Sequence, residues 1–318
     1  MSTTKYQIQF QKGLGLPKFI KDFGTEEQCE RYLIELKWGR RFKCPKCGQH
    51  HASAFRRRGR PYFQCSVCRH QTSLTAGTLF HGSHLPLTTW FLALYLVSEA
   101  KTQLSSLELH RLIHVNHKTA WLMLHKIMQV MVNAEQARKL TGRIEMDDAY
   151  LGGKRSGGKS GRGAAGKQPF LAAIQTSDDD KPHYRPHYAK IAPVKGFSLE
   201  EVELWTRNNI TKGSHVVSDA LQCFKGVEST CSHEVHTANK MTEAQKKKHF
   251  QWVNTVLSNV KTGLTGAFHS FDCSKYSFRY LGAVVYRFNR RFNLDLIFLD
   301  LVEDISGSPP INIHSIRL

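Results

Sequence analysis

Two pairs of cysteines constrain the fold of this chain more strongly than any other feature. Two residues separate Cys44 from Cys47, two separate Cys65 from Cys68, and 17 residues lie between the pairs. Each short gap lets a tight turn bind one metal ion, and the longer gap fits a β-hairpin. A redox function usually needs one such pair, whereas four thiolates suit tetrahedral Zn²⁺. We therefore predict a zinc ribbon over residues 37–75, with a structural ion because no ligand position is left open.

The predicted ribbon is basic. Residues 37–70 contain no Asp or Glu, and the hairpin between the cysteine pairs carries Arg56, Arg57, Arg58 and Arg60. The whole chain has 45 Lys and Arg against 26 Asp and Glu, a formal net charge of +19. Such a charge favours a polyanionic partner. We expect the four arginines to contact nucleic-acid phosphates, rather than to form an ordinary solvated surface.

The sequence disfavours a membrane function. The longest apolar run in the N-terminal half, residues 90–97, is far shorter than the roughly 20 residues that a membrane span needs. The N-terminus has no continuous apolar region of the secretory kind. We therefore expect a cytosolic protein that acts on nucleic acid.

Residues 102–127 favour two helices joined by a short turn. Leu104, Leu107, Leu112 and Ile113 are expected to pack the first helix against its neighbours. In DNA-binding helix-turn-helix motifs the start of the second helix usually meets base edges. The residues at that position here are His117, Lys118 and Thr119. Many helical hairpins never touch DNA, so recognition is one of two interpretations.

Composition divides the chain into five segments. We predict an N-terminal helical segment, the zinc ribbon, a helix-turn-helix region, an α/β domain and a C-terminal tail, at residues 1–36, 37–75, 76–140, 141–300 and 301–318. The α/β class follows from short apolar runs that alternate with helical patterns. A glycine-rich basic segment, 152–168, includes Lys154 and Arg155. It is either a loop without function or a mobile loop that closes on DNA phosphates.

Polar residues stand where apolar runs of the α/β domain end. Asp147 and Asp148 end one predicted strand, and Asp219 ends another. Carboxylates from neighbouring strands can begin a site for Mg²⁺ or Mn²⁺, although a single strand-end Asp is usually a turn residue. A helical pattern follows, in which Asn254 and Lys261 lie seven residues apart on one face. Between Asp219 and Asn254 lie 34 residues.

This order of residues resembles the DDE-type insertion-sequence transposases, most closely their zinc-ribbon branch. The similar stretches are CPKC, CSVC, KTAWLML, IEMDDAYLGGK, HVVSDA, WVNTVLSNVK and YRFNRRF. The resemblance implies an RNase-H-like mixed sheet with helices on both faces. It makes Asp147 the first metal ligand, Asp219 the second and Asn254 the third, a position where the branch has Glu, Asn or His. Asp148 stands where the branch usually has Glu, so either neighbour remains a candidate ligand.

The resemblance also implies the chemistry. Two ions, Mg²⁺ or Mn²⁺, would lie between the three ligands; one would activate water or a DNA 3′-hydroxyl and the other would stabilise the leaving oxygen. Lys261 would contact a phosphate, unless it is a solvated helix lysine. Three arginines of YRFNRRF would neutralise the DNA backbone, unless they only border a packed face: Arg287, Arg290 and Arg291.

We therefore expect a bacterial, cytoplasmic, nucleoid-associated transposase. It would act as a homo-oligomer on double-stranded DNA, at the terminal inverted repeats of its element and at target DNA. The alternative is a catalytically silent DNA-binding protein derived from a transposase, since Asn254 would bind metal less tightly than an acid. A zinc-ribbon transcription or RNA-processing factor would not explain the order of Asp147, Asp219, Asn254 and Lys261.

Overall fold

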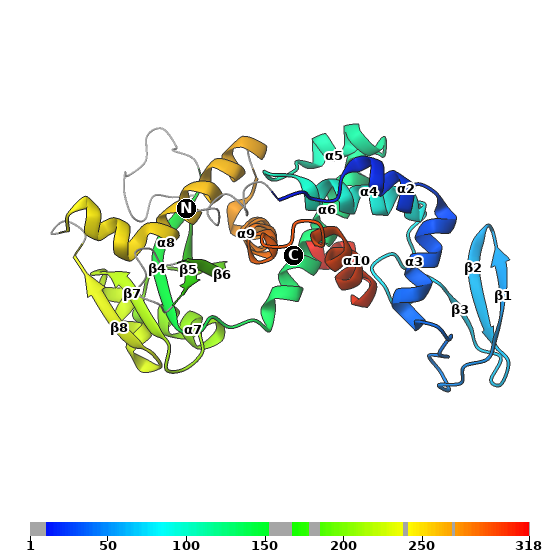
Figure 1. The fold of residues 1–318 in the computed structure, drawn as a ribbon, viewed down its shortest axis with the longest axis horizontal. Helices are drawn as coiled ribbons and strands as arrows, with labels where there is room; N and C mark the ends of the chain where they lie inside the picture. Colours follow the sequence, from blue (N-terminus) through cyan, green and yellow to red (C-terminus); the bar gives the residue numbers. More distant parts are fainter. Residues whose placement is uncertain (1–10, 153–166, 178–184, 238–240, 269–270, 318) are drawn as a thin grey trace, which may run out of the picture. The chain divides into compact units, whose positions relative to one another are not determined.

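The computed structural model of the chain describes residues 11–152, 167–177, 185–237, 241–268 and 271–317 (Figure 1). Within these ranges, 11–130 and 292–317 form one unit, and 131–291 form a second. We call them the N-terminal unit and the sheet unit. Residues after 291 thus belong with the N-terminal unit, although they follow the sheet unit in the chain. No helix of the described residues is long and apolar enough to cross a membrane.

A five-stranded mixed sheet forms the centre of the sheet unit. Its strands are β4 (Arg143–Leu151), β5 (Gln168–Thr176), β6 (Pro186–Pro193), β7 (His215–Asp219) and β8 (Ser232–His236). The order is β6-β5-β4-β7-β8. β4, β5 and β6 are antiparallel neighbours, whereas β4, β7 and β8 run parallel. This order and these directions are those of an RNase-H-like sheet, so the predicted fold class is confirmed.

Alternation along β4 gives the sheet two different faces. Ile144 and Met146 are fully buried in an apolar core with α7 (Leu199–Asn209) and the 3-10 helix η1 (Gln222–Ser229). Gly226 allows η1 to pack closely on α7, because a Cβ there would lie 2.4 Å from the carbonyl oxygen of Leu199. The intervening residues of β4 are charged and face the opposite side.

Helix α8 (Glu243–Ala267) covers that charged face and packs on β4, β5 and β7. It begins with a capping box, in which Thr242 and Gln245 satisfy each other's backbone N–H groups. Helix α9 (Cys273–Arg290) is capped by Asp272 and packs along β6. Figure 1 shows α8 in yellow and orange beside the green strands of the sheet.

The ribbon forms as the cysteine spacing predicts. Strands β1 (Ala52–Arg57), β2 (Arg60–Cys65) and β3 (Gln71–Ser73) are antiparallel. Arg58 and Gly59 form the hairpin loop, and both have positive φ, 51° and 77°. A two-residue loop of this kind matches the twist of the two strands and presents Arg58 at the tip.

Helices build the rest of the N-terminal unit: α2 (Leu16–Phe23), α3 (Glu26–Trp38), α4 (Leu87–Glu99), α5 (Ser106–Ile113), most of α6 (His117–Gln136), α10 (Ile297–Gly307) and α11 (Ile313–Arg317). Residues 131–136 of α6 belong to the sheet unit. Phe298 of α10 packs its ring against Phe19, Phe23 and Phe91. The predicted C-terminal tail is therefore largely helical and begins within α10.

Helices α5 and α6 form the predicted hairpin, with a turn of three residues. His114 ends α5 in the left-handed conformation, φ 52°. The predicted packing of α5 is partly wrong: Leu107 and Leu112 are 47% and 48% exposed, whereas Leu109 is fully buried. The helix is only two turns long, so it buries a single narrow face, and that face runs through Leu109 and Ile113.

Candidate active site

Two aspartates meet at the ends of neighbouring parallel strands. The register pairs Glu145 of β4 with Val217 of β7. Two residues further along each strand, Asp147 and Asp219 therefore lie side by side on the face that α8 covers. Asp148 follows directly, and one carboxylate oxygen of each of the three aspartates lies within 4.8 Å of the others. The sequence had left open which of Asp147 and Asp148 joins the site, and the structure brings both to it.

The pKa of Asp147 is strongly raised. Burial raises the pKa of its carboxyl group to about 7 from an ordinary 3.8. The N–H of Asp148, 2.8 Å from Asp147 Oδ1, opposes this rise, whereas the charges of Asp148 and Asp219 add to it. Lys261 of α8 is close enough to lower the pKa of Asp147 again. A divalent cation would offset this concentrated negative charge, and carboxylate oxygens are the ligands that Mg²⁺ and Mn²⁺ prefer.

Asn254 and Lys261 lie on α8, and both are exposed. The charge of Lys261 reaches Asp147, whereas its contact with a DNA phosphate stays a prediction. Asn254 directly follows Val253, whose backbone N–H donates to Glu145 of β4. The assignment of Asn254 as third metal ligand stays a prediction.

Arg143 and Glu145 contribute to the site although the motifs of the sequence do not include them. They form a buried ion pair, 3.2 Å between Nη1 and Oε1. Glu145 Oε2 also accepts the backbone N–H groups of Trp252 and Val253, at 2.8 and 3.0 Å. Within a regular α-helix such groups donate to carbonyls four residues back, so the carboxylate of β4 is a side-chain acceptor in the middle of α8. Charged residues at every second position of a buried strand, 143, 145 and 147, are the signal that the sequence offered.

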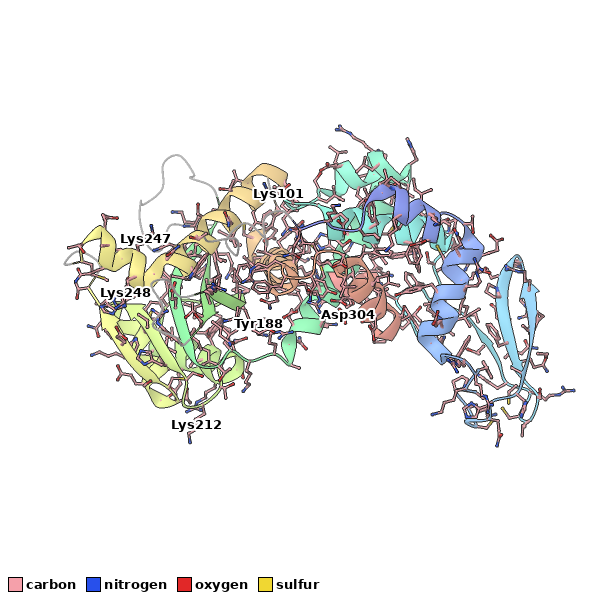
Figure 2. All side chains as sticks on the ribbon, viewed as in Figure 1. Lys101, Tyr188, Lys212, Lys247, Lys248 and Asp304 are labelled. Carbon is pink, nitrogen blue, oxygen red and sulfur yellow. The ribbon has the colours of Figure 1, made fainter. Side chains whose placement is uncertain are left out.

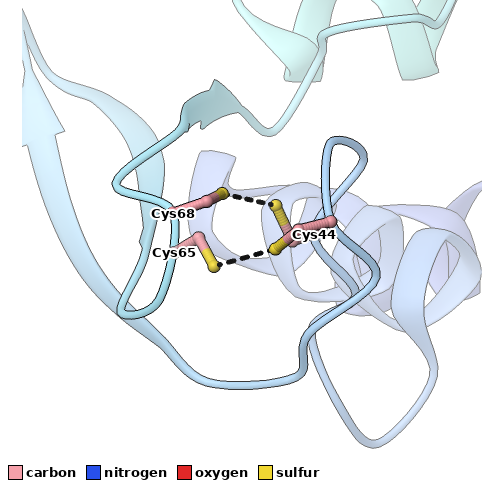
Figure 3. Close-up of side chains that lie close together, drawn as sticks. Cys44, Cys65 and Cys68 are labelled. Atoms are coloured by element: carbon pink, nitrogen blue, oxygen red, sulfur yellow. Dashed lines mark hydrogen bonds between the residues drawn. The ribbon is translucent and has the colours of Figure 1, made fainter.

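The four cysteines of the ribbon converge (Figure 3). The Sγ atoms of Cys44 and Cys68 are 3.6 Å apart, and so are those of Cys47 and Cys65. Each pair sits in the same kind of turn, in which the carbonyl of Cys44 accepts the N–H of Gly48 and that of Cys65 accepts the N–H of Arg69. Four thiols in this arrangement fit a structural Zn²⁺.

The four arginines of the ribbon hairpin differ in whether another side chain holds them in place. Arg56 donates to both carboxylate oxygens of Glu30 in α3, at 3.1 and 2.6 Å. Arg57 lies over the ring of Tyr62. Arg58 and Arg60 are exposed at the hairpin loop. Arg58 and Arg60 therefore offer the better phosphate contacts, although DNA binding by any of the four stays a prediction.

The other predicted DNA contacts lie in several places. His117 and Lys118 are exposed in the first turn of α6, and Thr119 is half-buried beside them. His117 Nε2 is 3.2 Å from Ser106 Oγ of α5. Lys154 and Arg155 lie outside the described residues.

The arginines at the end of α9 take part in packing. Arg290 donates to Glu135 of α6, at 2.6 Å, and stacks on Tyr286. Arg291 donates to the backbone oxygens of Pro186 and His187 in β6 and stacks on Phe288. Burial lowers the pKa of Arg287 to about 10. These contacts favour the packing interpretation of the three arginines, and their DNA role stays a prediction.

The zinc ribbon and the RNase-H-like sheet with its aspartate cluster are the features that the resemblance to zinc-ribbon transposases implies. Two families match the chain: "transposase zinc-ribbon domain" over residues 24–71 and "ISXO2-like transposase domain" over residues 139–289. The two matched ranges take in well over half of the chain. The chain belongs to the zinc-ribbon insertion-sequence transposases of the DDE superfamily, as its motifs predict.

A curated relative is consistent with this family. The chain is 29% identical over 135 residues to an uncharacterized protein in transposable element ISH50 of Halobacterium salinarum. The match takes in 42% of this chain and 44% of the relative, so the chain spans less than half of the relative's length. The solved Mos1 transposase paired-end complex with left transposon end aligns over 67% of this chain and 79% of that chain, at 8% identity and a TM-score of 0.18. That structural similarity is too low to carry an argument.

Proposed function

We propose that this protein is an active DNA transposase that binds the terminal inverted repeats of an insertion sequence and catalyses metal-dependent strand cleavage and strand transfer. One observation carries the proposal: the carboxylates of Asp147 and Asp219 meet at the ends of parallel strands β4 and β7. Carboxylates that lie this close repel one another and destabilise the fold unless a cation binds between them, and the strongly raised pKa of Asp147 reflects that repulsion and its burial.

The ligands of this site are Asp147, Asp219 and Asn254. Bound Mg²⁺ or Mn²⁺ ions would supply the positive charge that phosphoryl transfer needs at the attacking and leaving oxygens. Asp147 is favoured over Asp148, because alternation along β4 directs Asp147 to the face shared with Asp219 and α8. Lys261 stands near Asp147 and would contact a phosphate beside the cleaved bond.

The same proposal assigns the DNA-binding surfaces. The exposed arginines of the ribbon loop and the first turn of α6 would hold the inverted repeats, through Arg58, Arg60, His117, Lys118 and Thr119. Lys154 and Arg155 would contact the DNA backbone. The net charge of +19 suits a partner that carries many phosphates. We expect a homo-oligomer on the DNA.

The test uses DNA that carries the ends of the element. The full chain is incubated with end-bearing and scrambled DNA, with Mg²⁺ or with a chelator. The proposal predicts nicking and joining of end-bearing DNA only with Mg²⁺, and loss of both in Asp219→Ala with DNA binding retained. Unchanged cleavage by Asp219→Ala would contradict the proposed site.

A second candidate is a silent DNA-binding protein derived from a transposase. One observation favours it: the third position is Asn254, an amide without formal charge, so metal binding is weaker than with three acids. This candidate predicts specific binding to the element's ends without cleavage, with Mg²⁺ or Mn²⁺.

A further inference from the structure

A second polar cluster lies on the same face of the sheet as the aspartates. Glu234 and His236 are two residues apart on β8, and His249 reaches them from α8. One possible ligand atom of each lies within 4.8 Å of the others. The predicted functions of the chain, DNA binding, the zinc ribbon and the aspartate site, make no use of these three residues.

The spacing of the three side chains suits a bound ion. Glu234 Oε1 lies 3.5 Å from His249 Nδ1 and 2.5 Å from His236 Nε2. Two ligands of a tetrahedral ion, each roughly 2.1 Å from it, lie roughly 3.4 Å apart. The distance to His249 already fits. The distance to His236 is that of a hydrogen bond, which would open by about an ångström when an ion replaces the shared proton.

His249 is half-buried, and the contact of its Nδ1 with Glu234 is an ion-pair distance, not a hydrogen bond. Its Nδ1 is buried and makes no hydrogen bond with any residue that the structure describes. Its ring centroid is 4.0 Å from that of His236. A buried, unsatisfied ring nitrogen is costly, and coordination of an ion would satisfy it.

The three side chains also interact electrostatically. Burial lowers the pKa of His249, and the positive charges of His236 and Arg143 lower it further. Burial opposes ionisation of Glu234, but hydrogen bonds from His215 and His236 lower its pKa overall.

A further histidine orients the carboxylate. His215 Nε2 lies 2.9 Å from Glu234 Oε2, and His215 Nδ1 lies 3.0 Å from Ser232 Oγ. The hydrogen bond with His215 holds Oε2 of Glu234 in place, so that Oε1 is the oxygen that would bind an ion. Metal sites commonly have such outer hydrogen bonds, which fix the direction of a ligand.

We propose that Glu234, His236 and His249 form a second Zn²⁺ site, separate from the ribbon and from the aspartates. Its mixed nitrogen and oxygen ligands select a transition-metal ion, whereas the all-oxygen aspartate cluster selects Mg²⁺ or Mn²⁺. The ion joins the end of β8 to α8, five residues before Asn254. Register pairs His236 with Asp219, so the ion holds α8 beside the candidate active site. Lys247 and Lys248, which precede His249, are exposed (Figure 2).

The test counts zinc ions in the full chain. Protein is dialysed with excess Mg²⁺ and a weak chelator, and zinc per chain is measured by mass spectrometry. We expect two ions in the wild type and one in His249→Ala, with two retained in Asp219→Asn. His233→Ala is the matched control: this residue lies on the opposite face of β8, where it contacts Glu228 and Ser218, and two ions should remain. One ion in the wild type, or two in His249→Ala, would overturn the proposal.

Cobalt separates loss of the site from loss of folding. Co²⁺ bound by four thiolates gives intense charge-transfer bands, and Co²⁺ bound by nitrogen and oxygen gives weak visible bands. His249→Ala should lose only the weak bands, with the thiolate bands and helical circular dichroism unchanged. If that variant loses its helical signal, Glu234→Gln, which keeps the shape of the side chain, decides: retention of both ions and both sets of bands would overturn the proposal.

Discussion

Glu145 Oε2 lies 2.8 Å from the backbone nitrogen of Trp252, in the middle of α8. This hydrogen bond joins two parts of the candidate active site. Glu145 is two residues before Asp147 on β4, and Trp252 is two residues before Asn254 on α8. The same carboxylate also forms a buried ion pair with Arg143. The position of Asn254 relative to the aspartates therefore depends on Glu145.

Replacing Glu145 should destabilise the sheet unit strongly. Glu145→Ala leaves Arg143 buried without the carboxylate of Glu145 and removes a side-chain acceptor of two N–H groups of α8, so we expect a loss of about 3 kcal/mol in the free energy of unfolding. Urea denaturation followed by circular dichroism measures it. The double variant Arg143→Met with Glu145→Gln should lose less, because no unpaired charge remains buried. A loss below about 1 kcal/mol in Glu145→Ala would show that the bond contributes little.

Asn254 is expected to serve the chemistry and not DNA binding. Asn254→Ala should abolish strand transfer, a loss of about 100-fold or more, because a metal ligand is removed. DNA affinity should stay unchanged, and Asn254→Glu should retain part of the activity. Asn259→Ala is the matched control, since Asn259 is also exposed on α8 but lies on a different face. Wild-type strand transfer by Asn254→Ala would remove Asn254 from the site.

Substitutions of Arg56 and of Arg58 should have different effects on DNA binding and on stability, although the two residues are only two positions apart. Arg58 is exposed at the loop tip, so Arg58→Gln should weaken DNA binding and reduce the slope of log affinity against log salt by about 1. Arg56 is held by Glu30, so Arg56→Gln should mainly lower the free energy of unfolding. Salt titrations of DNA binding and thermal unfolding separate the two effects. Equal salt slopes for Arg58→Gln and the wild type would rule out a phosphate contact at Arg58.

Metal binding at the aspartates should depend on pH. The raised pKa of Asp147, about 7, means that this group is protonated below neutral pH, and a divalent ion must then displace the proton. Above neutral pH the carboxylate is already charged. Mg²⁺ affinity should therefore fall as pH drops through about 7, by up to tenfold per pH unit. Calorimetry in buffers of different ionisation enthalpy should detect close to one proton released at pH of about 6 and few at about 8.5. The same proton release at both would contradict the assignment.

Local patterns in the sequence predicted much of the fold. The ribbon depends on Cys44, Cys47, Cys65 and Cys68, which act through two short turns that the chain itself encodes. Likewise, the ends of two apolar runs predicted that Asp147 and Asp219 would lie close together. Features of this kind can be predicted from the spacing of residues along the chain, and both are present in the structure.

Other features depend on contacts between distant segments. The bonds from Trp252 and Val253 to Glu145 join residues more than a hundred positions apart, and no local pattern encodes them. The packing of Phe298 among the N-terminal helices is a similar case. The apolar residues of α5 fit two helical phases, one of which buries Leu107, and only the neighbours of α5 decide between them.

The central claim is that Asp219 binds the ion that carries out DNA cleavage. Asp219→Cys tests it directly, because a thiolate binds Mg²⁺ poorly and softer ions such as Mn²⁺ better. Cleavage of end-bearing DNA is measured for the wild type and the variant with each ion. We predict that Asp219→Cys is inactive with Mg²⁺ and regains cleavage with Mn²⁺, while the wild type cleaves with both. Activity of the variant with Mg²⁺ equal to that of the wild type would contradict the account.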